Sequence, residues 1–363
     1  MAEVLPVGIT GLAVLSALGR GSEPQLAAAL SGTAAFGPVR RFDVSGRRVG
    51  LAATLDRAGS LSDELAGVVE QACQDAGLTA GQRAATPLLL AVHGHPGAGA
   101  EAVRLAERAG LAGAGRVYIG ACVSASTAVA DAALLIRRGA ERVLVAAGYL
   151  VESDQFALFD AGQALATDGA VRPFSAGRTG LLLGDAVAAV LLESEAAAAA
   201  RGRRPATRLV GWGRAGDAYH PCQPAPDGGG LARAVEAALR RAGVAPDALG
   251  YINANATGTQ LSDAAEAAAL RTALGAAADR IPVSSTKAVH GHALEASGLL
   301  ELVITVLSLQ AGKLPVNAGY LGPDPSCPLD VIAGSPRPVA SPYALSLNSA
   351  FGGANTALLV QAT

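Results

Sequence analysis

Cys122 has the sequence context of a nucleophile. It lies in the stretch from Arg116 to Val129 (RVYIGACVSASTAV), which is typical of a short strand, a turn of small residues and an Ala-rich helix. A cysteine at such a turn sits at a helix N-terminus, where unpaired amides and the helix dipole stabilise a thiolate and lower the thiol pKa. That arrangement suits a thiol that forms and releases a thioester. The alternative is a small buried hydrophobe, the usual role of a free cysteine, and distant residues must decide between the two.

The composition excludes several classes of protein. The 363 residues carry a net charge of -2, so there is no basic field of the kind that nucleic-acid binding requires. The four cysteines are widely spaced, without the paired spacing of a zinc or redox motif. They are typical of reduced thiols in a cytoplasmic protein. The chain is long enough for one large domain or two medium ones.

Apolar stretches raise the question of a membrane. Residues 7–18 are apolar, but they lack preceding basic residues and contain two glycines, which favours a first strand and turn over a signal peptide. Elsewhere charged residues interrupt the apolar runs, as Asp185 does within 181–192. We expect none of them to reach the roughly 18 residues of a membrane span. The sequence therefore predicts no membrane partner.

Strand-like and helical segments alternate along most of the chain, which predicts an α/β architecture. Continuous apolar character predicts strands that are covered on both faces. A charged, low-complexity bridge at 197–205 divides the chain into two halves, 1–205 and 206–363. The predicted strands are 88–92, 116–120, 142–147, 186–193, 208–213, 250–253, 280–284 and 343–347, and the predicted helices are 61–76, 124–138, 230–242, 262–274 and 293–310.

Several blocks, in the same order, resemble the β-ketoacyl synthases of the thiolase superfamily. Residues 284–298 (SSTKAVHGHALEASG) resemble the family's Ser-Ser-Thr-Lys block that ends in Gly-His, and residues 251–259 (YINANATGT) resemble its Asn-Ala-His-Gly-Thr block. Further matches lie at 217–220, 173–184 and 351–355, and residues 7–11 resemble the opening strand. The resemblance implies a five-layered αβαβα sandwich of two pseudo-symmetric halves. It also implies that the chain dimerises.

The resemblance assigns roles to four residues. Cys122 corresponds to the nucleophile that takes an acyl group from an acyl carrier protein or a coenzyme A thioester. His292 corresponds to the second histidine, whose imidazole N–H can donate to the thioester oxygen as negative charge develops. Lys287 lies fourteen positions before Glu301 and matches a buried pair that supports the site. No cofactor is implied.

Two departures from the family pattern change the expected chemistry. Asn255 stands where the family has its first catalytic histidine. An amide can donate a hydrogen bond to an oxyanion, but it cannot act as acid or base. Decarboxylative condensation is therefore in question, whereas acylation of Cys122 can survive because it relies mainly on the helix dipole and backbone donors. His290 replaces the usual threonine before Gly291 and is a candidate acid/base, with a packing or solvent-facing role as the alternative.

Other departures concern the entrance of the site. Ser349 stands where the family has a gating phenylalanine, so Ser349, Phe351 and Gly352 form a candidate acyl-gate and oxyanion region. Only residues 96–121 separate His95 from Cys122, where the family has a longer insertion that helps to form the dimer contact and acyl pocket. The two His-Gly-His triplets, at 93–95 and 290–292, lack nearby thiolates or carboxylates in the sequence, so we expect turns there and no metal site.

Two functions remain open at this point. The first is ketosynthase-like acyl transfer or carbon–carbon condensation through an acylated Cys122 in polyketide or fatty-acid biosynthesis, by a homodimer. The second is a non-catalytic subunit, similar to a chain length factor, in a heterodimer with a ketosynthase. The absent histidine and absent gate favour the second, whereas the presence of Cys122, Lys287 and His292 favours the first.

Overall fold

A long mixed sheet organises the chain. The computed structural model describes residues 6–363. Ten strands follow the order β11-β10-β14-β15-β9-β1-β8-β7-β5-β6, and β2 (Gly19–Arg20) pairs with β1. The strands of the N-terminal part are β1 (Val7–Ser16), β5 (Pro87–Ala91), β6 (Gly113–Tyr118), β7 (Arg142–Tyr149) and β8 (Ala186–Ser194). Those of the C-terminal part are β9 (Thr207–Gly216), β10 (Leu249–Asn253), β11 (Val283–Ser284), β14 (Tyr343–Ala350) and β15 (Ala354–Ala362).

The two parts of this sheet repeat one pairing pattern. In the N-terminal part, β1 is antiparallel to β8 and β8 to β7, whereas β7, β5 and β6 are parallel. The C-terminal part has the same pattern: β9 is antiparallel to β15 and β15 to β14, whereas β14, β10 and β11 are parallel. Within residues 6–363, three residue pairs between β1 and β9 join the two parts of the sheet. The division at residue 205 stays a prediction, and it falls between α7 and β9, where the pattern begins again.

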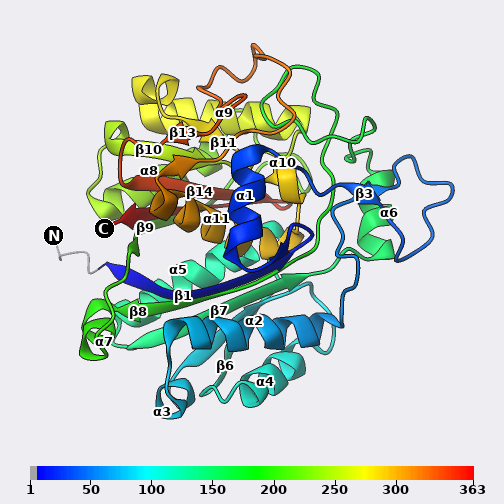
Figure 1. The fold of residues 1–363 in the computed structure, drawn as a ribbon. Helices are drawn as coiled ribbons and strands as arrows, with labels where there is room; N and C mark the ends of the chain where they lie inside the picture. The colour runs from blue at the N-terminus through cyan, green and yellow to red at the C-terminus, as the bar shows by residue number, and fades with distance from the viewer. Residues whose placement is uncertain (1–5) are drawn as a thin grey trace.

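Helices cover both faces of each part, which produces five layers (Figure 1). The outer layers are α2 (Leu61–Ala76) with α4 (Ala98–Arg108), and α8 (Gly229–Ala242) with α9 (Gln260–Leu274). The middle layer is α5 (Ser124–Arg137) and α11 (Ser297–Ala311). Three apolar clusters fill the spaces between the layers. The predicted thiolase-like αβαβα sandwich is confirmed.

Shorter elements connect these layers. The remaining helices are α1 (Ser22–Ser31), α3 (Ala80–Ala84), α6 (Ser153–Ala161), α7 (Glu195–Ala200) and α10 (Lys287–His290). The 3-10 turns are η1 (Ala121–Val123), η2 (Pro246–Ala248), η3 (Gly275–Asp279) and η4 (Leu294–Ala296). The short strands pair as β3 (Gly37–Pro38) with β4 (Leu51–Ala52), and β12 (Lys313–Leu314) with β13 (Arg337–Pro338). The turns η1 and η4 matter most here, because they lead into the two central helices.

The apolar character of α11 follows from its place in the middle layer. The stretch Leu294–Ala311 has the length and composition of a membrane span, so the expectation that no apolar stretch reaches that length is wrong. In the fold, 83% of this stretch is buried, because sheet lies on both sides of the helix. Its apolar residues therefore pack the two parts of the sheet together.

Candidate active site

The turn η1 holds Cys122 at the centre of the molecule. It follows the carboxyl end of β6 and runs directly into α5, as the sequence predicted. Ala121, immediately before the cysteine, has a φ of 53°, a left-handed conformation that non-glycine residues rarely adopt. Such backbone strain is common where a fold positions a reactive group. The cysteine side chain is buried, with 7% of the residue exposed.

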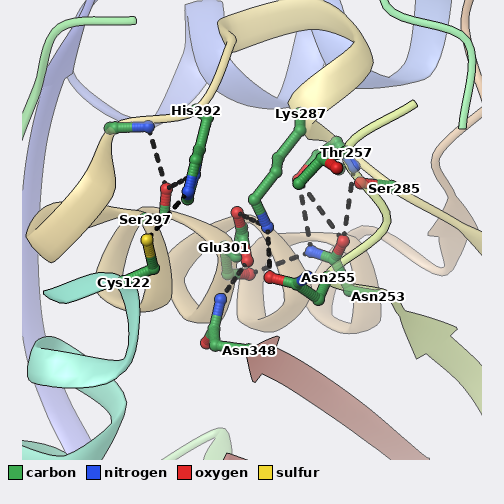
Figure 2. A network of polar contacts seen from close by, with 12 residues as sticks. Cys122, Asn253, Asn255, Thr257, Ser285, Lys287, His292, Ser297, Glu301 and Asn348 are labelled. Carbon is green, nitrogen blue, oxygen red and sulfur yellow. Dashed lines mark hydrogen bonds and ion pairs between the residues drawn. The ribbon is translucent and has the colours of Figure 1, made fainter. Parts of the chain in front are cut away.

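His292 lies against the cysteine. Its Nε2 is 3.0 Å from Cys122 Sγ, and its Nδ1 is 2.9 Å from the Ser297 hydroxyl (Figure 2). Ser297 also accepts a hydrogen bond from the Ala293 amide at 2.9 Å. The backbone N–H of His292 donates to the Leu182 carbonyl at 2.7 Å, which fixes the histidine to the N-terminal half. Because a hydroxyl can donate or accept, Ser297 can support either tautomer of the imidazole.

Burial keeps both groups of this pair neutral. It raises the pKa of the Cys122 thiol to about 12, and the charge of Glu295 acts in the same direction, against Lys287 and a backbone amide. The expectation of a lowered thiol pKa is therefore wrong, since the loss of solvation outweighs the helix end. Burial also lowers the pKa of His292 well below its usual value, and Lys287 and His290 reinforce the shift. The resting pair is a thiol beside a neutral imidazole.

Lys287 fixes the orientation of Asn255. Its ammonium lies 2.7 Å from Glu301 Oε1 and 3.3 Å from Asn255 Oδ1. Because an ammonium has only donors, the amide oxygen must face it, and the amide N–H₂ is left as a donor on the other side. Lys287 and Glu301 are 1% and 0% exposed. Burial raises the pKa of the Glu301 carboxyl, and Lys287 opposes that shift.

Two polar residues that sequence reasoning missed extend this network to the other half of the chain. Asn348 donates to Glu301 Oε2 at 2.7 Å, and Ser126, on α5, donates to the Asn348 side-chain oxygen. Figure 2 shows Glu301 and Asn348 beside Cys122, His292 and Ser297. Ser297 and Glu301 are four residues apart on α11, so the same face of this helix contacts both His292 and Lys287. Asn348 adjoins the predicted gate at Ser349, which was the only sequence signal for it.

The candidate acid/base and gate residues lie elsewhere in the network. His290 is fully buried, and its ring nitrogens contact the Gly291 carbonyl at 2.7 Å and the Thr286 hydroxyl at 3.1 Å. None of its described hydrogen bonds reaches Cys122, so we leave His290 out of the proposed chemistry. Ser349 donates to the Asn355 side chain at 2.7 Å.

The rest of the gate region lies at the surface. Phe351 is half-exposed and stacks on Phe159 with ring centroids 5.8 Å apart. Gly352 donates its N–H to the Pro221 carbonyl at 2.6 Å. These contacts hold the stretch against neighbouring loops. The roles of Ser349, Phe351 and Gly352 in acyl entry remain predictions.

Both histidines of the triplet at 93–95 pair with carboxylates, one distant in the sequence and one nearby. His93 Nδ1 lies 3.0 Å from Glu295, and His95 Nε2 lies 3.1 Å from Glu101. Within residues 6–363, no three His, Cys, Asp or Glu side chains are grouped so that they could hold a metal ion. Cys73 and Cys327 are buried and Cys222 is exposed, all as free thiols.

The comparisons with known proteins agree with this geometry. The models of the β-ketoacyl synthase N-terminal and C-terminal domains match residues 80–198 and 206–320. The chain belongs to the β-ketoacyl synthase family. It is 34% identical over 256 residues to 3-oxoacyl-[acyl-carrier-protein] synthase 2 of Staphylococcus aureus. That match covers 69% of this chain and 64% of the relative, so only part of the relative's length is represented.

Solved β-ketoacyl synthase structures extend the likeness to nearly the whole chain. The ishigamide ketosynthase/chain length factor matches with a TM-score of 0.92 at 26% identity, covering 99% of this chain and 100% of that one. A β-ketoacyl synthase from Burkholderia phymatum matches with a TM-score of 0.90 at 28% identity, covering 99% of each. The predicted family is confirmed.

Proposed function

We propose that this protein is a ketosynthase-like enzyme that carries an acyl group on Cys122. The observation that supports the proposal best is the 3.0 Å contact between Cys122 Sγ and His292 Nε2. Sγ attacks the carbonyl carbon of an acyl thioester, and its proton passes to Nε2. The carbon–sulfur bond of the donor then breaks, and the proton goes to the departing thiol. His292 Nε2–H and the Asn255 amide donate to the carbonyl oxygen as it becomes negative.

The donor in this proposal is an acyl carrier protein or coenzyme A thioester in polyketide or fatty-acid biosynthesis. Membership of the family and the printed name of the Staphylococcus aureus relative, which includes the acyl carrier protein, support that donor. We infer a cytoplasmic protein that needs no cofactor. Condensation after acylation is the less supported step, because Asn255 provides no acid or base.

Acylation is the step to test. The purified chain is incubated with acyl carrier thioesters, and its intact mass is measured. We expect the added mass of one acyl group in the wild type and none in Cys122→Ala. An unmodified wild-type chain under conditions that acylate a known ketosynthase would contradict the proposal.

A non-catalytic partner subunit is the alternative. It is favoured by Asn255 and by the match to a chain named as a ketosynthase/chain length factor. In that case the isolated chain gives no adduct and instead forms a tight complex with a second ketosynthase chain. Retention of the Cys122–His292 contact and of the Lys287–Glu301 pair favours the enzyme.

A further inference from the structure

The internal symmetry of the fold places a second pair of polar residues opposite the first. His93 lies two residues after β5, and Asn255 lies two residues after β10, the corresponding strand of the other half. Cys122 is the middle residue of η1, and Glu295 is the middle residue of η4. Each turn opens on a non-glycine residue with positive φ and leads into a central helix. Glu295 and His93 are therefore the symmetry counterparts of Cys122 and Asn255.

These counterparts contact each other beside the nucleophile. Glu295 Oε1 lies 3.0 Å from His93 Nδ1. The turn η4, which carries Glu295, packs directly against η1, which carries Cys122, and against β7. After burial, the charge of Glu295 is the strongest influence that raises the Cys122 pKa. Position 255 thus has asparagine instead of histidine, whereas the symmetry-related position in the other half has His93, which is paired with a carboxylate.

One carboxylate oxygen has no partner. Glu295 is 3% exposed, and its Oε2 is buried without a hydrogen bond to any described residue. The Tyr149 hydroxyl, at the end of β7, is also buried without a hydrogen bond to any described residue. Burial, followed by the charge of Glu295, raises the pKa of this hydroxyl. Buried polar atoms are nearly always satisfied, and a catalytic role is one of the explanations for an exception. His93, by contrast, has a side chain that is 49% exposed. The pair therefore connects a buried oxygen to solvent.

The Glu295 carboxylate disfavours an anionic acceptor of the acyl group and favours a neutral one. A negative charge beside Cys122 repels the carboxylate of a malonyl extender. The same charge is a base for a neutral O–H group. We propose that Glu295 is a general base, positioned by His93, that activates the hydroxyl of water or of an alcohol to attack the acyl-Cys122 thioester. This inference rests on the proposed acylation of Cys122.

The step conserves atoms and charge. The hydroxyl oxygen forms a bond to the acyl carbonyl carbon while its proton moves to Glu295 Oε2. The bond between that carbon and Cys122 Sγ then breaks, and the proton moves from Glu295 to the thiolate, which has a high affinity for it. The products are a carboxylic acid or an ester and the free thiol. His292 and Asn255 hold the oxyanion, as in acylation.

The test measures loss of the acyl group from Cys122 in the full chain. An acyl aryl ester loads Cys122 of wild type, Glu295→Gln and His93→Ala, together with Glu236→Gln, a matched change at an exposed glutamate on α8. The adduct is followed by intact mass in buffer, with and without added alcohol. We expect release to slow at least about 100-fold in Glu295→Gln, to slow less in His93→Ala, and to be unchanged in Glu236→Gln. Wild-type release should show a solvent deuterium isotope effect that Glu295→Gln lacks.

The outcomes separate this inference from the proposed function. If carrier thioesters fail to acylate the chain but the aryl ester succeeds, the proposed function is wrong and release still tests Glu295. Equal release rates and equal isotope effects in wild type and Glu295→Gln would overturn the role of Glu295, as would failure of the aryl ester to acylate Cys122. Neutral hydroxylamine needs no base, and it should release the acyl group equally from wild type and Glu295→Gln. Formation of an ester identifies the alcohol as acceptor, and formation of acid alone identifies water.

Discussion

In the proposed chemistry, Asn255 limits the steps that can follow acylation of Cys122. Its amide oxygen is bound to Lys287 at 3.3 Å, and its backbone N–H donates to Glu266 at 2.8 Å, so the residue is held at both ends. An amide held in this way offers hydrogen-bond donors to an oxyanion, but it cannot act as a general acid or base at neutral pH. We therefore expect decarboxylation of a malonyl group to be the step most weakened by asparagine in place of histidine.

Replacement of Asn255 by histidine should restore part of that step. We expect the wild type to release little carbon dioxide from labelled malonyl carrier protein and Asn255→His to release it about tenfold faster or more, in line with the contribution of a single added catalytic group. Asn255→Gln keeps the amide and serves as the control. Release by the wild type as fast as by Asn255→His would show that the asparagine does not limit the reaction.

His290 should make stability depend on pH. Burial, followed by the charge of Lys287, lowers its pKa to about 3 in the folded chain, against 6.5 for the ordinary side chain. The unfolded chain therefore binds a proton that the folded chain does not, and the stabilisation is complete above pH 6.5 and lost as the pH falls. Between pH 6.5 and 5 this amounts to about 2 kcal/mol.

Chemical denaturation at several pH values checks this expectation. Other buried groups titrate in the same range, so the informative quantity is the difference between wild type and His290→Gln. The free energy of unfolding of the variant should fall less between pH 6.5 and 5. Parallel curves for the two proteins would contradict the assignment of a neutral, buried His290.

At the scale of elements, the site depends on how closely α5 approaches α11. A Cβ placed on Gly298, in the first turn of α11, would lie 2.1 Å from Ser126 Oγ and 2.8 Å from Asn348 Oδ1. Both of those side chains belong to the network that holds Glu301 and Lys287. The glycine therefore allows the helices that carry the nucleophile turn and the histidine turn to meet.

Gly298→Ala should destabilise the protein by about 1–3 kcal/mol, because an added methyl group overpacks a filled interior. The matched control is Gly99→Ala in α4, where nothing lies within 4 Å of the added Cβ. That change should stabilise by about 0.5–1 kcal/mol through lower backbone entropy. Thermal unfolding of the two variants tests the claim. Equal melting temperatures would mean that the helix crossing tolerates a methyl group.

Many of the long helices and strands could be predicted from the sequence, whereas others of similar length could not. The helix predicted at 61–76 matches α2 in full, and strands predicted at 142–147 and 186–193 match β7 and β8 to within two residues. β15 and α4 were missed. β15 follows directly on the Phe-Gly-Gly motif, which is typical of a turn. The buried face of α4 has helical spacing but consists of Ala98, Ala102, Leu105 and Ala106, and short alanine side chains give only weak evidence of burial.

The site was partly predictable for a similar reason. Cys122, His292, Lys287 and Glu301 stand in recognisable blocks of sequence, and the structure places them together. Glu295 lies within the same block as His292, and Asn348 lies next to the predicted gate, but the sequence does not show which side chains they contact. The fold brings Glu295 to His93, 202 positions away, and Asn348 to Glu301, 47 positions away. The direction of the Cys122 pKa shift was also missed, since burial at the centre of five layers is a property of the whole fold.

At the scale of the whole molecule, the exposed edge of the sheet indicates self-association. β6 is the last strand of the sheet among the described residues, and its outer edge is unpaired. Ile119, just after this strand, is 61% exposed. An unpaired edge beside an exposed apolar side chain is a place where a second chain can add.

Sedimentation of single-residue variants tests whether this edge makes the expected dimer. Ile119→Lys should shift the protein from dimer to monomer, because a charge would be buried at the contact. The matched control is Leu261→Lys on α9, where the leucine is also 61% exposed but lies far from this edge. A wild-type monomer at micromolar concentration, or equal association of both variants, would contradict a homodimer through β6.

Site-resolved mass spectrometry after incubation with an acyl carrier thioester tests the central claim most directly. The exposed Cys222 is the built-in comparison, because indiscriminate acylation would modify it before the buried Cys122. We expect one acyl group on the peptide that contains Cys122, present in Cys222→Ala and absent in Cys122→Ala. An acyl group on Cys222 alone, or on no cysteine, would contradict the claim.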